Sequence, residues 1–164
     1  MIFEFKTTVG HNGWIGTLII PDDIAEQLEI SKIKRVVAEV SKADNEVTLY
    51  AGVIKRKGIK YLMLSKANRK ALNLEDGDTV KVSMSEDTSK YQAPMTEELE
   101  AVLLSDYEAY QIFENLLPGK QRNIIFMIYR INDSQKRVDV ALNAMENLKM
   151  GNLNPMKFEK ILPL

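Results

Sequence analysis

Apolar and polar residues alternate along most of the first half of the chain. In residues 2–9, Phe3, Phe5 and Val9 fall on one face and Glu4, Lys6 and Thr8 on the other, which is the period of a half-buried strand. Asn12-Gly13 then predicts a hairpin turn, because both residues tolerate positive φ. Five further segments, rich in β-branched and apolar residues, predict strands: residues 14–20, 34–40, 46–53, 60–65 and 79–84. The first half therefore predicts about six strands.

Two short helices are predicted between these strands. Residues 21–28 begin with Pro21 and two acidic residues, which suit the amino end of a helix. Ser65 is the expected N-cap of a helix over 66–72, and Asn73 is expected to take the left-handed conformation that ends it, before the turn EDGD. Short strands with helical corners predict a small closed or partly closed β-barrel, because closure removes exposed strand edges.

The apolar period changes after residue 95. Residues 89–94 are polar and end in a proline, which predicts a linker. Beyond it, apolar residues recur every three or four positions, as in amphipathic helices. Four helices are predicted from these start and stop signals: starts at Thr96, Ser105 with Glu108, Pro118, and Asn132 with Gln135, and a stop at Gly151. We therefore expect an α+β fold, with a β-barrel domain over residues 1–88, a linker over 89–94 and a four-helix module over 95–164.

Composition narrows the class of protein. Apolar residues make up 45% and charged residues 27% of the chain, as in a soluble globular protein. No apolar run approaches the roughly 20 residues that span a bilayer, and no export signal begins the chain, so we expect a cytoplasmic protein without membrane insertion. With no cysteine, disulfides and thiolate zinc sites are excluded. The 22 basic and 23 acidic residues nearly balance, so any basic patch must be local.

The sharpest local feature is a basic run between residues 53 and 72. No acidic residue lies between Glu46 and Glu75. The candidates for an anion or nucleic-acid site are Lys55, Arg56, Lys57, Lys60, Lys66, Arg69 and Lys70. Tyr61 would offer a stacking surface beside them. The alternative, which the neighbouring EDGD turn favours, is a solvated hairpin tip and helix face without a ligand.

Candidate pocket and catalytic residues are few. Trp14, Tyr61 and Met63 are the residues expected to line a small pocket if one exists, although a role in the core or as a barrel plug is favoured. His11 is the only histidine and falls in a predicted turn. A zinc site needs several ligands and a nucleophile triad needs a base with a partner, so one histidine without cysteine predicts neither. We therefore expect no catalytic residue, metal or cofactor. An enzyme would need a pair formed by the fold, such as an EDGD carboxylate near Arg35 or His11.

Several motifs resemble a bacterial family. GW at residues 13–14, the apolar strand ending IP, and GIKYLMLSKANRKALNLEDGDTVKV resemble the uncharacterised barrel domain found with YdeI or OmpD-associated (OmdA) proteins, often labelled bacteriocin-protection proteins. PMTEELEAVLLSDYEAYQIFENLLPGKQRNIIFMI resembles the helical domain of that family. The chain keeps Arg130, Lys136 and Arg137 but departs from the family pattern around them. The resemblance implies a fold and an association with envelope or antimicrobial stress, and it implies no catalytic residue.

The unit SKANRKALNLEDGD also resembles the barrels of AbrB and MazE DNA-binding proteins, where a basic helix precedes a glycine-aspartate turn. The turn needs Gly and Asp whatever the barrel does, so this similarity concerns architecture first. Together these features predict a non-enzymatic binding protein for a small ligand or a protein partner, linked to tolerance of bacteriocin or envelope stress. The alternative is a nucleic-acid-binding regulator that uses the basic run of residues 53–72.

Overall fold

The computed structural model describes residues 1–10 and 16–162. The chain divides into two compact units, Met1–Thr88 and Ser89–Leu164, each with its own hydrophobic core. His11, Trp14 and the hairpin turn predicted at Asn12-Gly13 lie outside the described residues.

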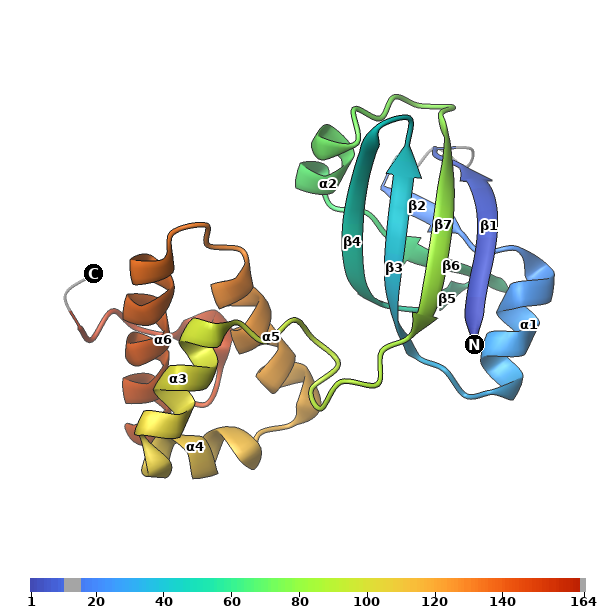
Figure 1. Ribbon diagram of the computed structural model, residues 1–164. Coiled ribbons are helices and arrows are strands. Elements are labelled where there is room, and N and C mark those ends of the chain that lie inside the picture. Colours follow the sequence, from blue (N-terminus) through green and yellow to red (C-terminus); the bar gives the residue numbers. More distant parts are fainter. Residues whose placement is uncertain (11–15, 163–164) are drawn as a thin grey trace. The chain divides into compact units, whose positions relative to one another are not determined.

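A four-stranded antiparallel sheet in the order β1-β7-β3-β4 forms one layer of the first unit (Figure 1). Its strands are β1 (Ile2–Thr8), β7 (Thr79–Glu86), β3 (Arg35–Lys42) and β4 (Asn45–Gly52). Phe3 of β1 and Ala38 of β3 both lie opposite Met84 of β7, and all three are buried. Because side chains alternate along a strand, this register turns the apolar set of each strand toward the core and the polar set outward.

A three-stranded sheet in the order β2-β6-β5 contributes to the same core. Its strands are β2 (Thr17–Ile19), β6 (Ile59–Met63) and β5 (Ile54–Arg56). Leu18 and Leu62 lie opposite each other and are fully buried. Lys57 and Gly58, with φ values of 51° and 78°, form the turn between β5 and β6, and such left-handed turns match the twist of a hairpin.

The mixed α+β class is confirmed, but the predicted closed or partly closed barrel is not: the described strands form no closed barrel. In the described part of the chain, seven strands form two separate antiparallel sheets, with β1 and β4 at the edges of one and β2 and β5 at the edges of the other. β5 was not predicted, because its three residues are all exposed and show no apolar alternation. Closure depends on hydrogen bonds between strands that are distant in the sequence, and alternation identifies the faces of a strand but not its neighbours.

Two helices complete the first unit: α1 (Asp22–Ile30) and α2 (Lys66–Ala71). α1 follows Pro21 and buries Ile24 and Leu28 in the core. The Ser65 hydroxyl accepts a hydrogen bond from the Asn68 N–H at 3.1 Å, so Ser65 is the N-cap of α2 as predicted. Asn73 has a φ of 51°, which confirms the left-handed position after this helix.

The second unit is helical in its described residues. Its elements are α3 (Glu97–Ser105), α4 (Tyr107–Glu114), α5 (Pro118–Tyr129), α6 (Ser134–Lys149) and the short 3₁₀ helix η1 (Pro155–Lys157). Phe113 and Ile124 are fully buried at its centre. The segment expected to be a linker belongs to this unit, because Ala93 is part of the second core and Tyr91 packs against it. None of the described helices combines the length and apolar character needed to cross a bilayer.

Some predicted helix boundaries are confirmed. The Thr96 hydroxyl accepts from the Leu99 N–H at 3.2 Å and caps α3. Pro118 is the first residue of α5, where its missing N–H costs no intrahelical bond. Gly151 follows α6 with a φ of 85°.

Two predicted caps are wrong by one residue. Ser105 is the last residue of α3 and does not form a capping box with Glu108; Asp106 caps α4 instead. Asp133, and not Asn132, caps α6. Ser, Asn and Asp are all strong N-caps, so where two of them are adjacent their capping preferences do not determine which one is used.

Two buried asparagines of α6 hold the chain that follows it. The Asn147 amide donates to the Glu159 carbonyl at 2.8 Å and accepts from the Glu159 N–H at 2.9 Å. The Asn143 side-chain oxygen accepts from the Ile161 N–H at 2.8 Å. These hydrogen bonds replace those that the two amides would make to water. They explain why polar side chains are buried in this core.

Candidate functional site

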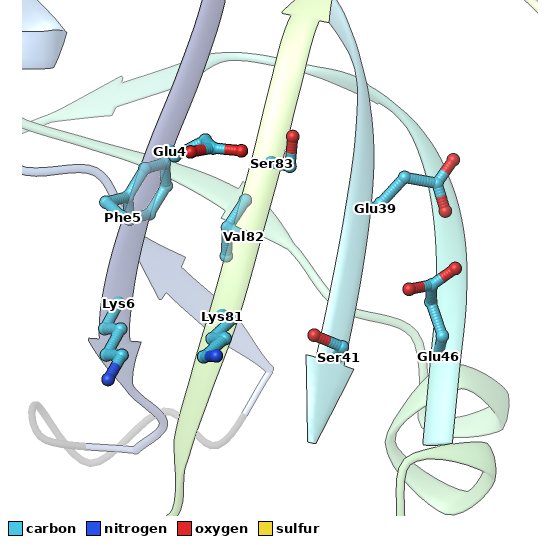
Figure 2. Close-up of a pocket in the computed structure, with 9 residues that line it drawn as sticks. All are labelled: Glu4, Phe5, Lys6, Glu39, Ser41, Glu46, Lys81, Val82 and Ser83. Carbon is cyan, nitrogen blue, oxygen red and sulfur yellow. The ribbon is translucent and has the colours of Figure 1, made fainter. Parts of the chain in front are cut away.

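The outer face of the four-stranded sheet carries a hollow of about 450 Å³, which we call the sheet hollow (Figure 2). All four strands contribute to it. Its lining residues are Glu4, Phe5, Lys6, Glu39, Ser41, Glu46, Lys81, Val82 and Ser83.

Strand register places one row of polar residues across the whole sheet. Lys6 of β1 lies opposite Lys81 of β7. Lys81 lies opposite Ser41 of β3, which in turn lies opposite Glu46 of β4. Residues directly opposite each other share a face of the sheet, so these four side chains all project outward.

A second row lies two residues farther along the strands. Glu4 of β1 is opposite Ser83 of β7, and Ser83 is opposite Glu39 of β3. Glu39 is opposite Thr48 of β4, whose hydroxyl donates a hydrogen bond to the Glu39 carboxylate at 2.9 Å. All residues of the two rows except Thr48 line the sheet hollow.

The charges of the sheet hollow are not neutralised within the described chain. Lys6 and Lys81, the basic pair, are like charges directly opposite each other, an arrangement that destabilises a sheet. Glu39 and Glu46, the acidic pair, lie on the neighbouring strands β3 and β4 (Figure 2). Among the residues that the structure describes, none of these four takes part in an ion pair. The hollow therefore presents uncompensated charge of both signs.

A second hollow of about 320 Å³ adjoins the first at the ends of β3 and β7. It shares with the sheet hollow Lys6, Ser41 and Lys81. Lys42 also lines it, but the Lys42 ammonium donates to the Asp78 carboxylate at 2.6 Å and to the Asn73 carbonyl at 2.7 Å. The fold therefore already uses the charge of Lys42.

The EDGD turn has a structural role at Asp78. Its carboxylate accepts from Lys42 and, at 2.8 Å, from the Glu75 N–H. These hydrogen bonds, the one from Lys42 first, hold the pKa of Asp78 below its ordinary value. Arg35 begins β3 and Lys42 ends it, about 23 Å away in an extended strand. The fold does not bring Asp78 and Arg35 together as an acid-base pair.

The part of the basic run that lies on the β5–β6 hairpin is bound to α1. The Lys60 ammonium donates to the Ala25 carbonyl at 3.0 Å and lies 3.0 Å from a Glu29 carboxylate oxygen. Lys55 lies 3.5 Å from the same oxygen. The hydrogen bond from Lys60, with the charge of Lys55, lowers the pKa of Glu29. Two of the predicted anion-binding residues therefore hold a helix in place.

The other residues of the basic run fall into two separate places. Arg56 and Lys57 are exposed on the hairpin, whereas Lys66 and Lys70 are exposed on α2, with Arg69 partly buried between them. The five residues of β6 separate these groups by about 17 Å. The run therefore does not form one patch, and nucleic-acid or anion binding by it stays a prediction.

The two described candidates for a pocket lie on the outer face of the small sheet. Tyr61 is half-buried and Met63 is 46% exposed, and they alternate along the chain with the buried Leu62 and Leu64. Neither lines the sheet hollow. Trp14, the third candidate, is outside the described residues.

A cluster in the second unit combines aromatic and charged groups. The Lys90 ammonium lies 5.1 Å from the ring centroid of Tyr91 and 5.8 Å from that of Tyr110, and it forms a 3.2 Å ion pair with Glu114. The Tyr91 hydroxyl donates to the Glu114 carboxylate. Burial and then this carboxylate raise the pKa of Tyr91 to about 12. The cluster holds the segment before α3 against α4, which is a structural role.

Sequence reasoning missed the charged pairs of the sheet hollow. The pattern of the first strand puts Glu4 and Lys6 on its polar face, but nothing in the sequence singles out Lys81, Glu39 or Glu46. The signal was present as the polar set of each alternating strand. Only the pairing of β1 with β7 and of β7 with β3 brings these residues to one place. The described residues contain no cluster of three or more His, Cys, Asp or Glu side chains that could hold a metal ion.

Comparison with known proteins adds one finding for the first unit. No curated protein matches the chain. Residues 5–84 match the family model of a domain of unknown function, DUF1905. This match extends from β1 into β7 and contains every lining residue of the sheet hollow except Glu4. The first unit of the chain is thus similar to DUF1905, and the sheet hollow lies within the matching part.

Proposed function

We propose that the protein is a non-enzymatic binding protein that takes a small charged ligand in the sheet hollow. The observation that supports this most directly is a hollow of about 450 Å³ lined by charges of both signs that form no ion pair in the described chain. Its volume falls within the range of about 300–1,000 Å³ that small-molecule sites occupy. Unpaired like charges such as Lys6 and Lys81 work against folding, and local conflicts of this kind concentrate at functional sites.

Binding fits the site better than catalysis. Lys6, Lys81, Glu39 and Glu46 are all exposed on an open sheet face. Catalytic electrostatics are strong where water is excluded and the charged groups are held rigidly. A surface hollow of long charged side chains binds a ligand reversibly, because its ion pairs are exposed to solvent and individually weak.

A screen by nuclear magnetic resonance tests this proposal. The full chain, labelled with ¹⁵N, is mixed with amino acids, carboxylates, phosphates and amines, and amide shifts are recorded. We expect shifts centred on Lys6, Ser41, Lys81 and Ser83. Lys81→Gln should weaken binding, whereas Lys66→Gln on α2 should leave it unchanged. Binders that shift only other regions, or the absence of any binder, would contradict the proposal.

Nucleic-acid binding by the basic run is the second candidate, favoured by the exposed side chains of Arg56, Lys57, Lys66 and Lys70. Its support is smaller because the run is divided and Lys55 is paired with Glu29. Fluorescence anisotropy with labelled DNA and RNA tests it. Affinity should fall steeply with salt and disappear when Lys55, Arg56 and Lys57 are changed to Glu. No binding at low salt removes this candidate.

The resemblance to YdeI or OmpD-associated proteins supports a role for this binding in tolerance of bacteriocin or envelope stress. A strain lacking the gene would be complemented with the wild type or with Lys81→Gln and then challenged with bacteriocin. We expect only the wild type to restore survival. Equal survival of all strains would contradict the role without affecting the ligand site.

A further inference from the structure

We infer that the ligand of the sheet hollow is zwitterionic, with an anionic group held by Lys6 and Lys81 and a cationic group held by Glu39 and Glu46. This inference rests on the proposed function, since it names the ligand class of the same hollow.

The basic pair forms the anionic end of the binding site. Lys6 and Lys81 lie directly opposite on β1 and β7, so their Cβ atoms are about 5 Å apart. Because the two side chains start this close together, an anion between their ammonium groups can contact both and remove their repulsion. The Ser41 hydroxyl, opposite Lys81 on the next strand, can donate a further hydrogen bond to the same anion.

The acidic pair forms the cationic end. Glu39 pairs with Thr48 and Glu46 pairs with Ser41, so the two glutamates are diagonal neighbours on β3 and β4, two positions apart along the ladder (Figure 2). The Thr48 hydroxyl holds the Glu39 carboxylate at 2.9 Å. Two neighbouring carboxylates that have no basic partner among the described residues present a site for an ammonium group.

The two ends do not neutralise each other. Lys81 and Glu39 are diagonal neighbours on β7 and β3, with Cβ atoms about 7–8 Å apart, yet they form no ion pair. The basic pair lies on β1 and β7, and the acidic pair lies on β3 and β4. The backbone distance between the midpoints of the two pairs is therefore two strand spacings, about 9.6 Å. A ligand with opposite charges at its two ends can fill this gap.

A ligand of one charge fits the hollow less well. An anion alone leaves Glu39 and Glu46 unpaired, and Glu4, which lines the hollow on β1, repels it as well. A cation alone leaves Lys6 and Lys81 repelling each other. Only a molecule with both charges compensates both pairs at once.

The inference is tested with ω-amino acids as probes on the full chain. ε-Aminocaproate carries both charges at the ends of a flexible chain, whereas caproate and hexylamine have similar length and one charge each. Amide shifts in a titration should show ε-aminocaproate bound at β1, β7, β3 and β4. Each single-charge analogue should bind about fivefold more weakly, the effect of one partly exposed ion pair. Glycine is too short to reach both ends and should not bind measurably.

Charge variants assign each end. Changing both Lys6 and Lys81 to Gln should lower the affinity for ε-aminocaproate to that of hexylamine. Changing Glu39 and Glu46 to Gln should lower it to that of caproate. A fourfold variant with Glu at both lysine positions and Lys at both glutamate positions exchanges the charges of the two ends. It should bind ε-aminocaproate again, with the carboxylate and the ammonium group of the ligand in exchanged places. All four residues are exposed, and the dispersion of the spectrum verifies that each variant is folded.

The outcomes separate this inference from the proposed function. If caproate binds in the hollow as tightly as ε-aminocaproate, the zwitterion is overturned and the hollow remains a site for an anion. If no probe shifts the hollow while a carboxylate, phosphate or amine of the broader screen does, the zwitterion is again overturned and the proposed function stands. If neither the probes nor the screen shifts the hollow, both are overturned.

Discussion

Lys42 at the end of β3 donates a 2.6 Å hydrogen bond to Asp78, in the turn that precedes β7. The same ammonium donates to the Asn73 carbonyl at 2.7 Å, so it joins the β3–β4 end of the sheet to the connection between α2 and β7. β7 is the strand that pairs with both β1 and β3. The contact therefore positions the strand that carries Lys81 into the sheet hollow.

The Lys42–Asp78 contact predicts a stability that depends on pH. Hydrogen bonds hold the folded-state pKa of Asp78 below its ordinary value of 3.8. As pH falls, the unfolded chain takes up the proton first, so the stabilisation is complete above pH 3.8 and is lost as pH falls through the lowered pKa. Asp78→Asn should lower the urea midpoint at neutral pH, and the difference from the wild type should shrink below pH 3.8. Asp44→Asn, at an exposed turn, is the control; a difference independent of pH would contradict the prediction.

Gly10 is predicted to resist substitution because of Asp76. Gly10 has a φ of 84°, and a Cβ added there would overlap the Asp76 carboxylate. Gly77 has a φ of 88°, and a Cβ added there would have no atom of the described residues within 4 Å. Gly77→Ala should therefore cost about 1–2 kcal/mol for the left-handed backbone alone, and Gly10→Ala should cost more.

Urea denaturation of both variants checks this prediction. Adding Asp76→Ala to Gly10→Ala should reduce the loss of stability to that of Gly77→Ala, because the overlap is then removed. Equal losses for the two glycine variants would show that the carboxylate moves aside without cost.

Asn147 is predicted to be the main support of the tail in the second unit. Its amide is 1% exposed and makes hydrogen bonds to Asn143, Asn152 and both backbone groups of Glu159. Asn147→Ala leaves several of these buried groups unpaired and should destabilise the unit by about 2–3 kcal/mol. Hydrogen exchange should show the Glu159 amide losing its protection. Asn123→Ala, at an exposed position of α5, is the matched control, and an equal effect of the two variants would contradict the prediction.

Lys81 is predicted to reduce the stability of the sheet. Because Lys81 faces Lys6, Lys81→Gln should stabilise the protein by about 0.5 kcal/mol at low salt while weakening ligand binding. The gain should diminish in 1 M salt, where the Debye length is about 3 Å. Denaturation at the two salt concentrations measures it. A loss of stability at low salt would show that Lys81 has a favourable role in the folded sheet.

Local structure was largely predictable from the sequence. Alternation identified β1 with the correct faces, β-branched and apolar content identified β3, β4 and β7, and Ser65, Thr96 and Pro118 marked helix starts correctly. These features depend on interactions within a few residues, namely capping hydrogen bonds, fixed proline φ and the period of two of a strand. The mixed α+β class follows from them. The wrong caps at Ser105 and Asn132 show the limit of such signals where neighbouring residues compete.

Strand neighbours, and with them the candidate site, depended on the tertiary structure. The chain shows that Lys6 and Lys81 lie on polar faces, but they are distant in sequence and only the β1–β7 ladder sets them side by side. The same ladder arrangement divides the strands into two sheets instead of a barrel. Likewise, the packing of α1 brings Glu29 into ion pairs with Lys55 and Lys60. The sequence, in which Glu29 lies far from the basic run, does not show these pairs. Alternation defines which way each side chain faces, whereas the hydrogen bonds between distant strands decide which side chains meet, and that pairing is a property of the whole fold.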